Sequence, residues 1–125
     1  MQKQDKKVLV VVNDLLFTVK ISDAAKRAGL TPEFVQSEAD VLDRAKQKPR
    51  LIIFDLNANT VEPLKLISRM KSDGEMKQIS VIGYLSHVQG ELKQQAQEAG
   101  ANIVMARSAF SQNLQQILKR HSGVV

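Results

Sequence analysis

The sequence has no cysteine and no long apolar run. Without cysteine the chain can form neither a disulfide framework nor a thiolate metal site or nucleophile. The longest uninterrupted apolar run, at 8–12, is far too short to cross a bilayer or to form the core of a signal peptide. No stretch rich in Pro, Gly or Ser indicates a linker. These absences predict a soluble, cytoplasmic protein that does not contact membranes, and the length predicts a single domain over residues 1–125.

Aromatic residues make up only 4% of the chain, and the basic residues form no cluster along it. The 18 Lys and Arg residues exceed the 13 Asp and Glu residues, which gives a net charge of +5, but they are spread over the whole sequence. Base stacking and phosphate tracking therefore have little support, and solubility alone accounts for the charge. A nucleic-acid-binding module is the less favoured of two alternative functions.

The segment 13–16, which follows the first apolar run, contains no glycine. Loops that bind mononucleotides use glycine there so that the backbone can approach a phosphate, and Asp14 would repel that phosphate. This weakens the other alternative, a mononucleotide- or flavin-binding protein of the flavodoxin-like type. The sequence also offers no nucleophile, base and orienting acid at the spacings of a catalytic triad, so we do not expect an enzyme.

What the sequence does contain is a regular alternation of short apolar runs and amphipathic segments. The runs at 8–12 and 51–54 are uninterrupted, which is typical of strands buried on both faces. Further strands are expected at 32–36, which is short and weaker, and at 79–85 and 103–106. Between the runs, apolar residues recur every three or four positions, as they do on one face of a helix. The pattern is a strand followed by a helix, five times over.

Cap-forming residues mark where three of these helices should begin. Asn13-Asp14 can form the turn and the N-cap of the first helix. The segment 37–40, Ser-Glu-Ala-Asp, has the form of a capping box for the second helix. Asn59 or Thr60 can cap the third helix.

Strand–helix alternation requires parallel strands with right-handed helical connections and helices on both faces of the sheet. We therefore predict an α/β fold with a doubly wound, five-stranded parallel sheet in a three-layer (βα)5 sandwich. Placing the two most hydrophobic runs side by side in the centre gives the strand order 2-1-3-4-5. The topological switch point then falls between the first and third strands, where folds of this kind bind their ligands.

Polar residues should meet at this edge of the sheet. The strand order brings Asn13, Asp14 and Asp55 to one crevice, and it places Ser86 and Arg107 on the same rim. Asp55 ends a strand that is otherwise apolar. Its carboxylate must therefore be held by a cation or by N–H groups, or be exposed for a function.

These features together resemble the receiver domain of response regulators, the fold of the chemotaxis protein CheY, over essentially the whole chain. The resemblance is carried by Val8-Leu9-Val10-Val11 with the Asn13-Asp14 corner, by Ile52-Ile53-Phe54-Asp55, by Val81-Ile82 and by Glu98-Ala99-Gly100-Ala101. It implies a signal-transduction module of the two-component or phosphorelay type. The implied partner is a histidine kinase or a downstream effector, docked through the fourth helix, the fifth strand and the fifth helix. Whether the chain forms homodimers stays open.

In that family an aspartate at the end of the third strand accepts a phosphoryl group, and Asp55 falls on this position. Catalysis there depends on positioning and on neutralising charge on the transferred oxygens, so Mg²⁺ is the implied cofactor. The family's two metal-binding acids fall on Val12 and Asn13 without gaps, or on Asn13 and Asp14 after a shift by one residue. Asn13, Asp14, Asp55 and Asn57 are thus the candidate ligands of a metal site that is weak or absent.

The other family positions depart in the same direction. The hydroxyl that ends the fourth strand falls on Leu85, with Ser86 one residue further as the candidate hydroxyl. The family's Lys-Pro pair is matched by Arg107 and Ser108. A cis bond before a residue other than proline costs ~2.5–4 kcal/mol, so we expect the Arg107–Ser108 bond to be trans. These departures favour a pseudo-receiver that acts by docking.

Charge balance suggests a role for Arg107. Asp55 and Arg107 sum to zero without a metal, and arginine can make a planar, bidentate bond to a carboxylate. We therefore expect Arg107 to hold Asp55. Two interpretations of Asp55 stay open: a usable phosphoacceptor, or a structural carboxylate satisfied by Arg107 or by backbone N–H groups. Asn13-Asp14 can likewise serve only as a turn and cap, and His87 only as a solvated loop residue.

Overall fold

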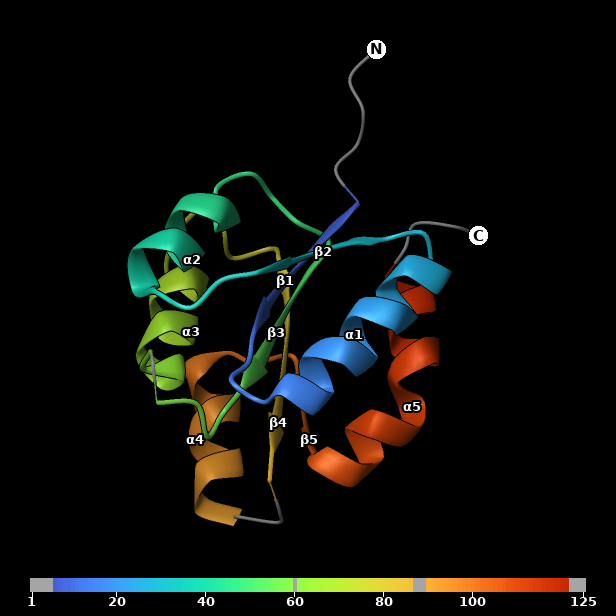
Figure 1. Cartoon of the computed structure of the whole chain (residues 1–125). Coiled ribbons are helices and arrows are strands. Elements are labelled where there is room, and N and C mark those ends of the chain that lie inside the picture. Colours follow the sequence, from blue (N-terminus) through green and yellow to red (C-terminus); the bar gives the residue numbers. More distant parts are fainter. Residues whose placement is uncertain (1–5, 60, 87–89, 122–125) are drawn as a thin grey trace.

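The computed structural model describes residues 6–59, 61–86 and 90–121, which form five strands, each followed by a helix (Figure 1). In chain order the elements are β1 (Lys7–Val11), α1 (Leu15–Arg27), β2 (Thr31–Phe34), α2 (Glu38–Ala45), β3 (Leu51–Asp55), α3 (Pro63–Lys71), β4 (Ser80–Leu85), α4 (Gly90–Ala99), β5 (Ile103–Ala106) and α5 (Arg107–Arg120).

The strands form one parallel sheet in the order β2-β1-β3-β4-β5, which confirms the predicted topology. β1 and β3 lie side by side in the centre, with Val10 opposite Ile53. Leu51 to Phe54 are fully buried, because helices cover both faces of this strand. The last residue of β3, Asp55, lies opposite Tyr84 of β4. The sheet therefore delivers the Asp55 carboxylate to the edge where the predicted crevice lies.

Alternate residues of the central strands face two separate hydrophobic layers. Leu9, Ile52 and Val81 pack on the side covered by α2, α3 and α4. Val10 and Ile53 pack on the side covered by α1 and α5. Figure 1 shows α2, α3 and α4 on one side of the sheet and α1 with α5 on the other. This is the predicted three-layer sandwich, and no helix of the described part is long and apolar enough to span a membrane.

The helix starts follow the predicted caps in two of three cases. Asp14 caps α1 by accepting hydrogen bonds from the N–H groups of Leu16 (2.8 Å) and Phe17 (3.4 Å). Ser37 Oγ caps α2 by accepting from the Asp40 N–H at 3.1 Å.

The prediction of the third cap was wrong for Asn59. α3 begins at Pro63, and the N-cap residue, Glu62, makes no side-chain cap bond. Proline favours the first helical position, because its φ suits a helix and it lacks the N–H that would go unpaired there. Thr60 lies outside the described residues.

The end of α3 is tied to the sheet by one lysine. Lys71 Nζ donates to the backbone oxygens of Ile79 (2.7 Å) and Lys77 (3.2 Å) and to Asn102 Oδ1 (3.0 Å). The same Asn102 oxygen accepts the Val81 N–H at 2.8 Å, which links the start of β4 to the loop before β5. Gly100, at φ +118°, leaves space for this side chain, because a Cβ there would lie 2.5 Å from Lys71 Cγ.

Lys71→Met should therefore lower the free energy of unfolding by about 1–3 kcal/mol, since it removes a charged donor from three acceptors. Urea denaturation measures this change. Lys77→Met is the matched control, because the Lys77 side chain is exposed, and it should change the stability by less than about 0.5 kcal/mol. Equal effects of the two substitutions would contradict a structural role of Lys71.

Candidate functional site

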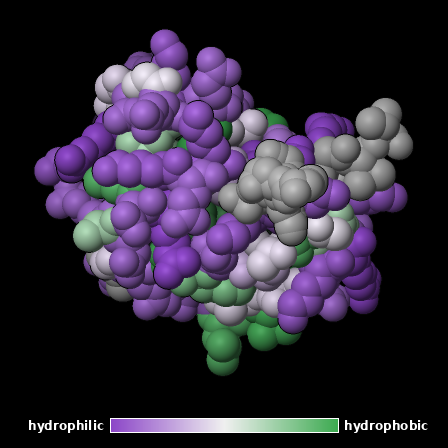
Figure 2. All heavy atoms as spheres, turned by 90° about the horizontal axis from the view of Figure 1, so that it is seen from above, coloured by the Kyte–Doolittle hydropathy of each residue, from purple (hydrophilic) through white to green (hydrophobic). Residues whose placement is uncertain are grey.

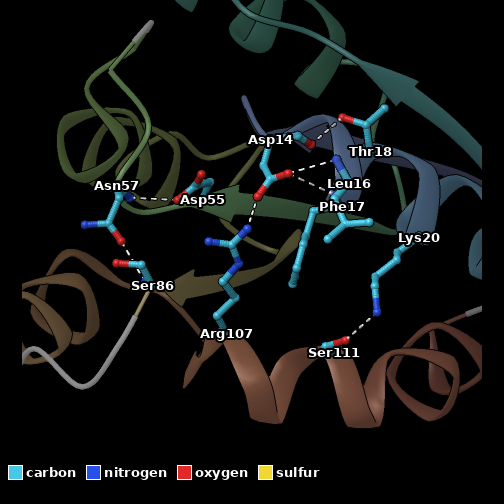
Figure 3. A network of polar contacts seen from close by, with 10 residues as sticks. All are labelled: Asp14, Leu16, Phe17, Thr18, Lys20, Asp55, Asn57, Ser86, Arg107 and Ser111. Atoms are coloured by element: carbon cyan, nitrogen blue, oxygen red, sulfur yellow. Dashed lines mark hydrogen bonds and ion pairs between the residues drawn. The ribbon is translucent and has the colours of Figure 1, made fainter.

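The carboxyl edge of the sheet gathers the predicted site residues from four strands (Figure 3). Asp14 follows β1, Asp55 ends β3, Ser86 follows β4, and Arg107 follows β5 directly as the first residue of α5. The peptide bond after Arg107 is trans as expected, since the described residues contain no cis bond. The convergence predicted from the strand order is thus present, and the pairing within it decides the chemistry.

Arg107 forms an ion pair with Asp14. Its guanidinium also lies over the ring of Phe17, 4.6 Å from the centroid. The Asp14 carboxylate divides its oxygens: Oδ1 accepts the backbone N–H groups that start α1, and Oδ2 faces Arg107. One carboxylate therefore caps α1 and joins it to the first residue of α5.

The expected pair between Arg107 and Asp55 is not formed, and the structure corrects this prediction. Because α5 begins at Arg107 without a loop, the side chain leaves β5 toward the first turn of α1. There it meets both an aromatic face, Phe17, and a carboxylate, a combination that favours a guanidinium. Figure 3 shows Arg107 directed at Asp14, with Asp55 turned toward Asn57.

Asp55 is held by the backbone instead. Its Oδ1 accepts the Asn57 N–H at 2.9 Å, and Asn57 Oδ1 in turn accepts the Ser86 N–H at 2.8 Å. No ion pair within the described part of the chain involves Asp55. Burial therefore raises the pKa of the Asp55 carboxyl above its ordinary value of 3.8, and the hydrogen bond from Asn57 offsets this only in part.

The residues at this edge do not fit Mg²⁺ well. Mg²⁺ requires near-octahedral coordination by hard oxygens, usually including carboxylates. Asp14 is engaged by Arg107, Asn57 Oδ1 accepts from Ser86, and the Asn13 side chain donates to Asn59 Oδ1 at 3.0 Å. Among the residues described, no group of three or more acids or histidines could hold a metal.

A cluster of three aromatic rings lies beneath the site, and no pattern in the sequence predicts it. The Tyr84 ring centroid lies 5.0 Å from that of Phe17 and 4.8 Å from that of Phe110, and the Phe17 and Phe110 centroids lie 6.1 Å apart. Burial raises the pKa of the Tyr84 hydroxyl, and the charge of Asp55 raises it further. The helical spacing of apolar residues in the sequence places Phe17 and Phe110 on the core faces of their helices, but it does not show that the two rings meet. Phe17, over whose ring the Arg107 guanidinium lies, belongs to this cluster. The cluster therefore holds in place the ring that Arg107 contacts.

Of the two loop residues considered after β4, the structure describes Ser86 but not His87. Ser86 is exposed and enters the site through its backbone N–H, while Leu85 at the family's hydroxyl position is buried. The role of the Ser86 hydroxyl stays a prediction. His87 lies outside the described residues.

Solved structures of response regulators share this architecture. One from Hahella chejuensis has a TM-score of 0.83 at 23% identity, with 96% of this chain and 97% of that chain covered. A putative response regulator from Chloroflexus aurantiacus has a TM-score of 0.81 at 19% identity, with 97% and 100% covered. The chain has the receiver-domain fold.

A third structure with the receiver fold holds a metal. It is the receiver domain of a sensor histidine kinase from Pseudomonas aeruginosa with magnesium in its active-site cleft, and it matches with a TM-score of 0.79 at 18% identity, covering 97% of this chain and 100% of that one. No family profile and no curated protein matches the sequence. The fold is therefore shared while the sequence has diverged far, and the flavin-binding alternative gains no support.

The coupling between Asp14 and Arg107 can be measured directly. Arg107→Ala should lower the free energy of unfolding by about 1–2 kcal/mol, because it removes an ion pair and a cation–π contact. Asp14→Asn keeps the N-cap acceptor but removes the charge, so the double-mutant cycle should give a coupling energy of about 0.5–1 kcal/mol. A coupling energy near zero would show that the pair contributes nothing.

Asp55 should make stability depend on pH. Because the folded-state pKa is raised above 3.8, the unfolded chain ionises first as pH rises, and this group's contribution to stability is lost through the folded pKa. Asp55→Asn should therefore raise the unfolding temperature at pH 7 by a few degrees and have no effect near pH 3. Glu75→Gln, on an exposed acid, is the control and should show no such difference. A destabilised Asp55→Asn protein at pH 7 would mean that the carboxylate has a cationic partner.

Proposed function

We propose that this protein is a receiver-like signal-transduction module of the two-component type that acts by docking to a protein partner, as a pseudo-receiver. The observation that carries the proposal is the Asp14–Arg107 ion pair. Phosphoryl transfer to Asp55 would need positive charge beside the transferred oxygens. The pair engages both Arg107, the cation at the family's lysine position, and Asp14, the one acid that remains of the family's metal-binding pair after the first strand.

The partner of such a module is a histidine kinase or a downstream effector. A face made of α4, β5 and α5 is the docking surface that the family resemblance implies. The outward residues of α4 are uniformly polar, and its one buried residue is Ala96. The single domain over 1–125, the cytoplasmic location and the docking role in place of catalysis are proposals that rest on composition and fold.

Exposure to Mg²⁺ and a small phosphodonor such as acetyl phosphate, followed by intact-mass measurement, tests this function. We expect no phosphoryl adduct on the wild-type protein. The matched variant Asn13→Asp/Arg107→Lys restores a second acid and the family's lysine, and it removes the guanidinium that pairs with Asp14. It should bind Mg²⁺ more tightly and gain an adduct that Asp55→Asn abolishes. A stoichiometric adduct on wild-type Asp55 would contradict the pseudo-receiver proposal.

A further inference from the structure

The two ends of the sandwich differ strongly in charge. The last turns of the five helices and the loops that lead into the strands lie together, at what is here called the amino end, which faces upward in Figure 1. The described segments of this end carry 12 basic and four acidic residues, a net charge of +8. They are 6, 24–30, 42–50, 68–79, 96–102 and 117–121. At the opposite end, the described loops and the first helical turns that follow them carry three basic and five acidic residues, a net charge of −2.

Helix ends alone do not account for this charge. Seven of the 12 basic residues lie in last helical turns, where a positive side chain offsets the partial negative charge of the helix C-terminus. The other five lie outside the helices: Lys6, Lys46, Lys48, Arg50 and Lys77. Figure 2 views the amino end and shows mostly hydrophilic side chains there. The end is therefore a broad polar surface with an excess of positive charge.

A hollow in this surface lies between the loop before β3 and the loop before β4. It has a volume of about 510 Å³. Lys48 and Arg50 line it from the first loop, and Glu75 and Gln78 line it from the second. The Arg50 N–H donates to the Lys7 carbonyl oxygen at 2.8 Å, which ties the first loop to β1. The hollow thus has room for a side chain of a partner, and its lining carries two positive charges against one negative.

The conformation of Lys48 favours glycine over lysine. Its φ is +59°, and no other non-glycine residue in the described part of the chain has a positive φ. Its N–H donates to the Ala45 carbonyl oxygen at 3.0 Å and closes the end of α2, a position where glycine is common because it has no Cβ. Lysine therefore gives the fold nothing there that glycine would not, and what it adds is a charge beside the hollow.

We propose that the amino end is a docking surface for an extended, acid-rich segment of a partner protein, with one carboxylate of that segment seated in the hollow between Lys48 and Arg50. The described segments of this end expose no large apolar side chain, so an extended chain with many carboxylates fits them better than an amphipathic helix. A width of roughly 30 Å, that of a small domain, takes about nine extended residues. The proposal goes beyond the proposed function, because it names a second face and a partner chemistry and does not depend on the state of Asp55.

The mixture of charges favours this occupant over the alternatives. Nucleic acid would bring a continuous line of phosphates against the four acidic residues of this end, whose described segments expose no aromatic side chain for base stacking. A membrane would need apolar side chains to insert, and Leu15, Leu16 and Val19 lie in the first turns of α1, at the opposite end. A second copy could offer only its own opposite end, whose charge of −2 is a weak complement. A peptide can place carboxylates beside the basic residues and neutral residues beside the acidic ones.

The probe is a synthetic peptide of about 12 residues in which glutamates alternate with serines and glycines, titrated into the full chain and followed by NMR. We expect saturable shifts in the loops at 46–50 and 72–79, and weaker binding as salt is added, because exposed charges are screened. Lys48→Gln/Arg50→Gln should weaken binding about tenfold or more. Lys65→Gln/Lys93→Gln is the matched control, because it makes the same change in net charge on exposed residues of the opposite end, and it should change binding less than about twofold.

Lys48→Gly separates binding from folding. Its unfolding temperature should equal or exceed that of the wild type, because glycine suits a φ of +59°. It should nevertheless weaken peptide binding about threefold or more, because a charge beside the hollow is lost. A lower unfolding temperature with unchanged binding would show that Lys48 serves the fold alone, and would contradict its role in docking.

Four further outcomes would overturn the proposal. The first two are no saturable binding of the peptide, and equal weakening by the two double variants, which would mean that only net charge matters. The others are tighter binding of a short DNA duplex than of the peptide at the same ionic strength, and binding of the chain to phosphatidylglycerol vesicles while the peptide does not bind. The phosphodonor assay reads Asp55 at the opposite end of the sheet, so the two proposals can fail separately.

Discussion

The arrangement of the site depends on the direction of the Arg107 side chain. β5 passes into α5 without a loop, so Arg107 stands both at the end of a strand and at the start of a helix. From there it reaches the Phe17 ring and the Asp14 carboxylate, and Asp14 at the same time caps α1. This ion pair therefore links the start of α1 to the start of α5 at the edge where ligands of this fold bind.

This arrangement determines the state of the other carboxylate. With Arg107 engaged at Asp14, Asp55 is left with a backbone N–H, and its charged form is disfavoured by burial. Under the proposed function, Asp55 lies at the phosphoacceptor position that the resemblance implies, while Arg107, which could neutralise charge during phosphoryl transfer, pairs with Asp14.

The sequence predicts the architecture well because periodicity and strand–helix alternation leave few choices. Two uninterrupted apolar runs, at 8–12 and 51–54, set the centre of the sheet, and the strand order follows from them. It also predicts which polar residues share the edge. It does not predict that Arg107 chooses Asp14 over Asp55, because that choice depends on the Phe17 ring and on α5 starting without a loop.

The central claim is that Arg107 stabilises Asp14 and not Asp55. A carbon-13 NMR titration of the Asp55 carboxyl, in the wild type and in Arg107→Ala, tests it most directly. The structure predicts a pKa above the ordinary 3.8 in both proteins, because its cause is burial and not the loss of a cation. If the pKa of Asp55 lay below 3.8 in the wild type and rose sharply in Arg107→Ala, Arg107 would be the partner of Asp55, and the account would be wrong.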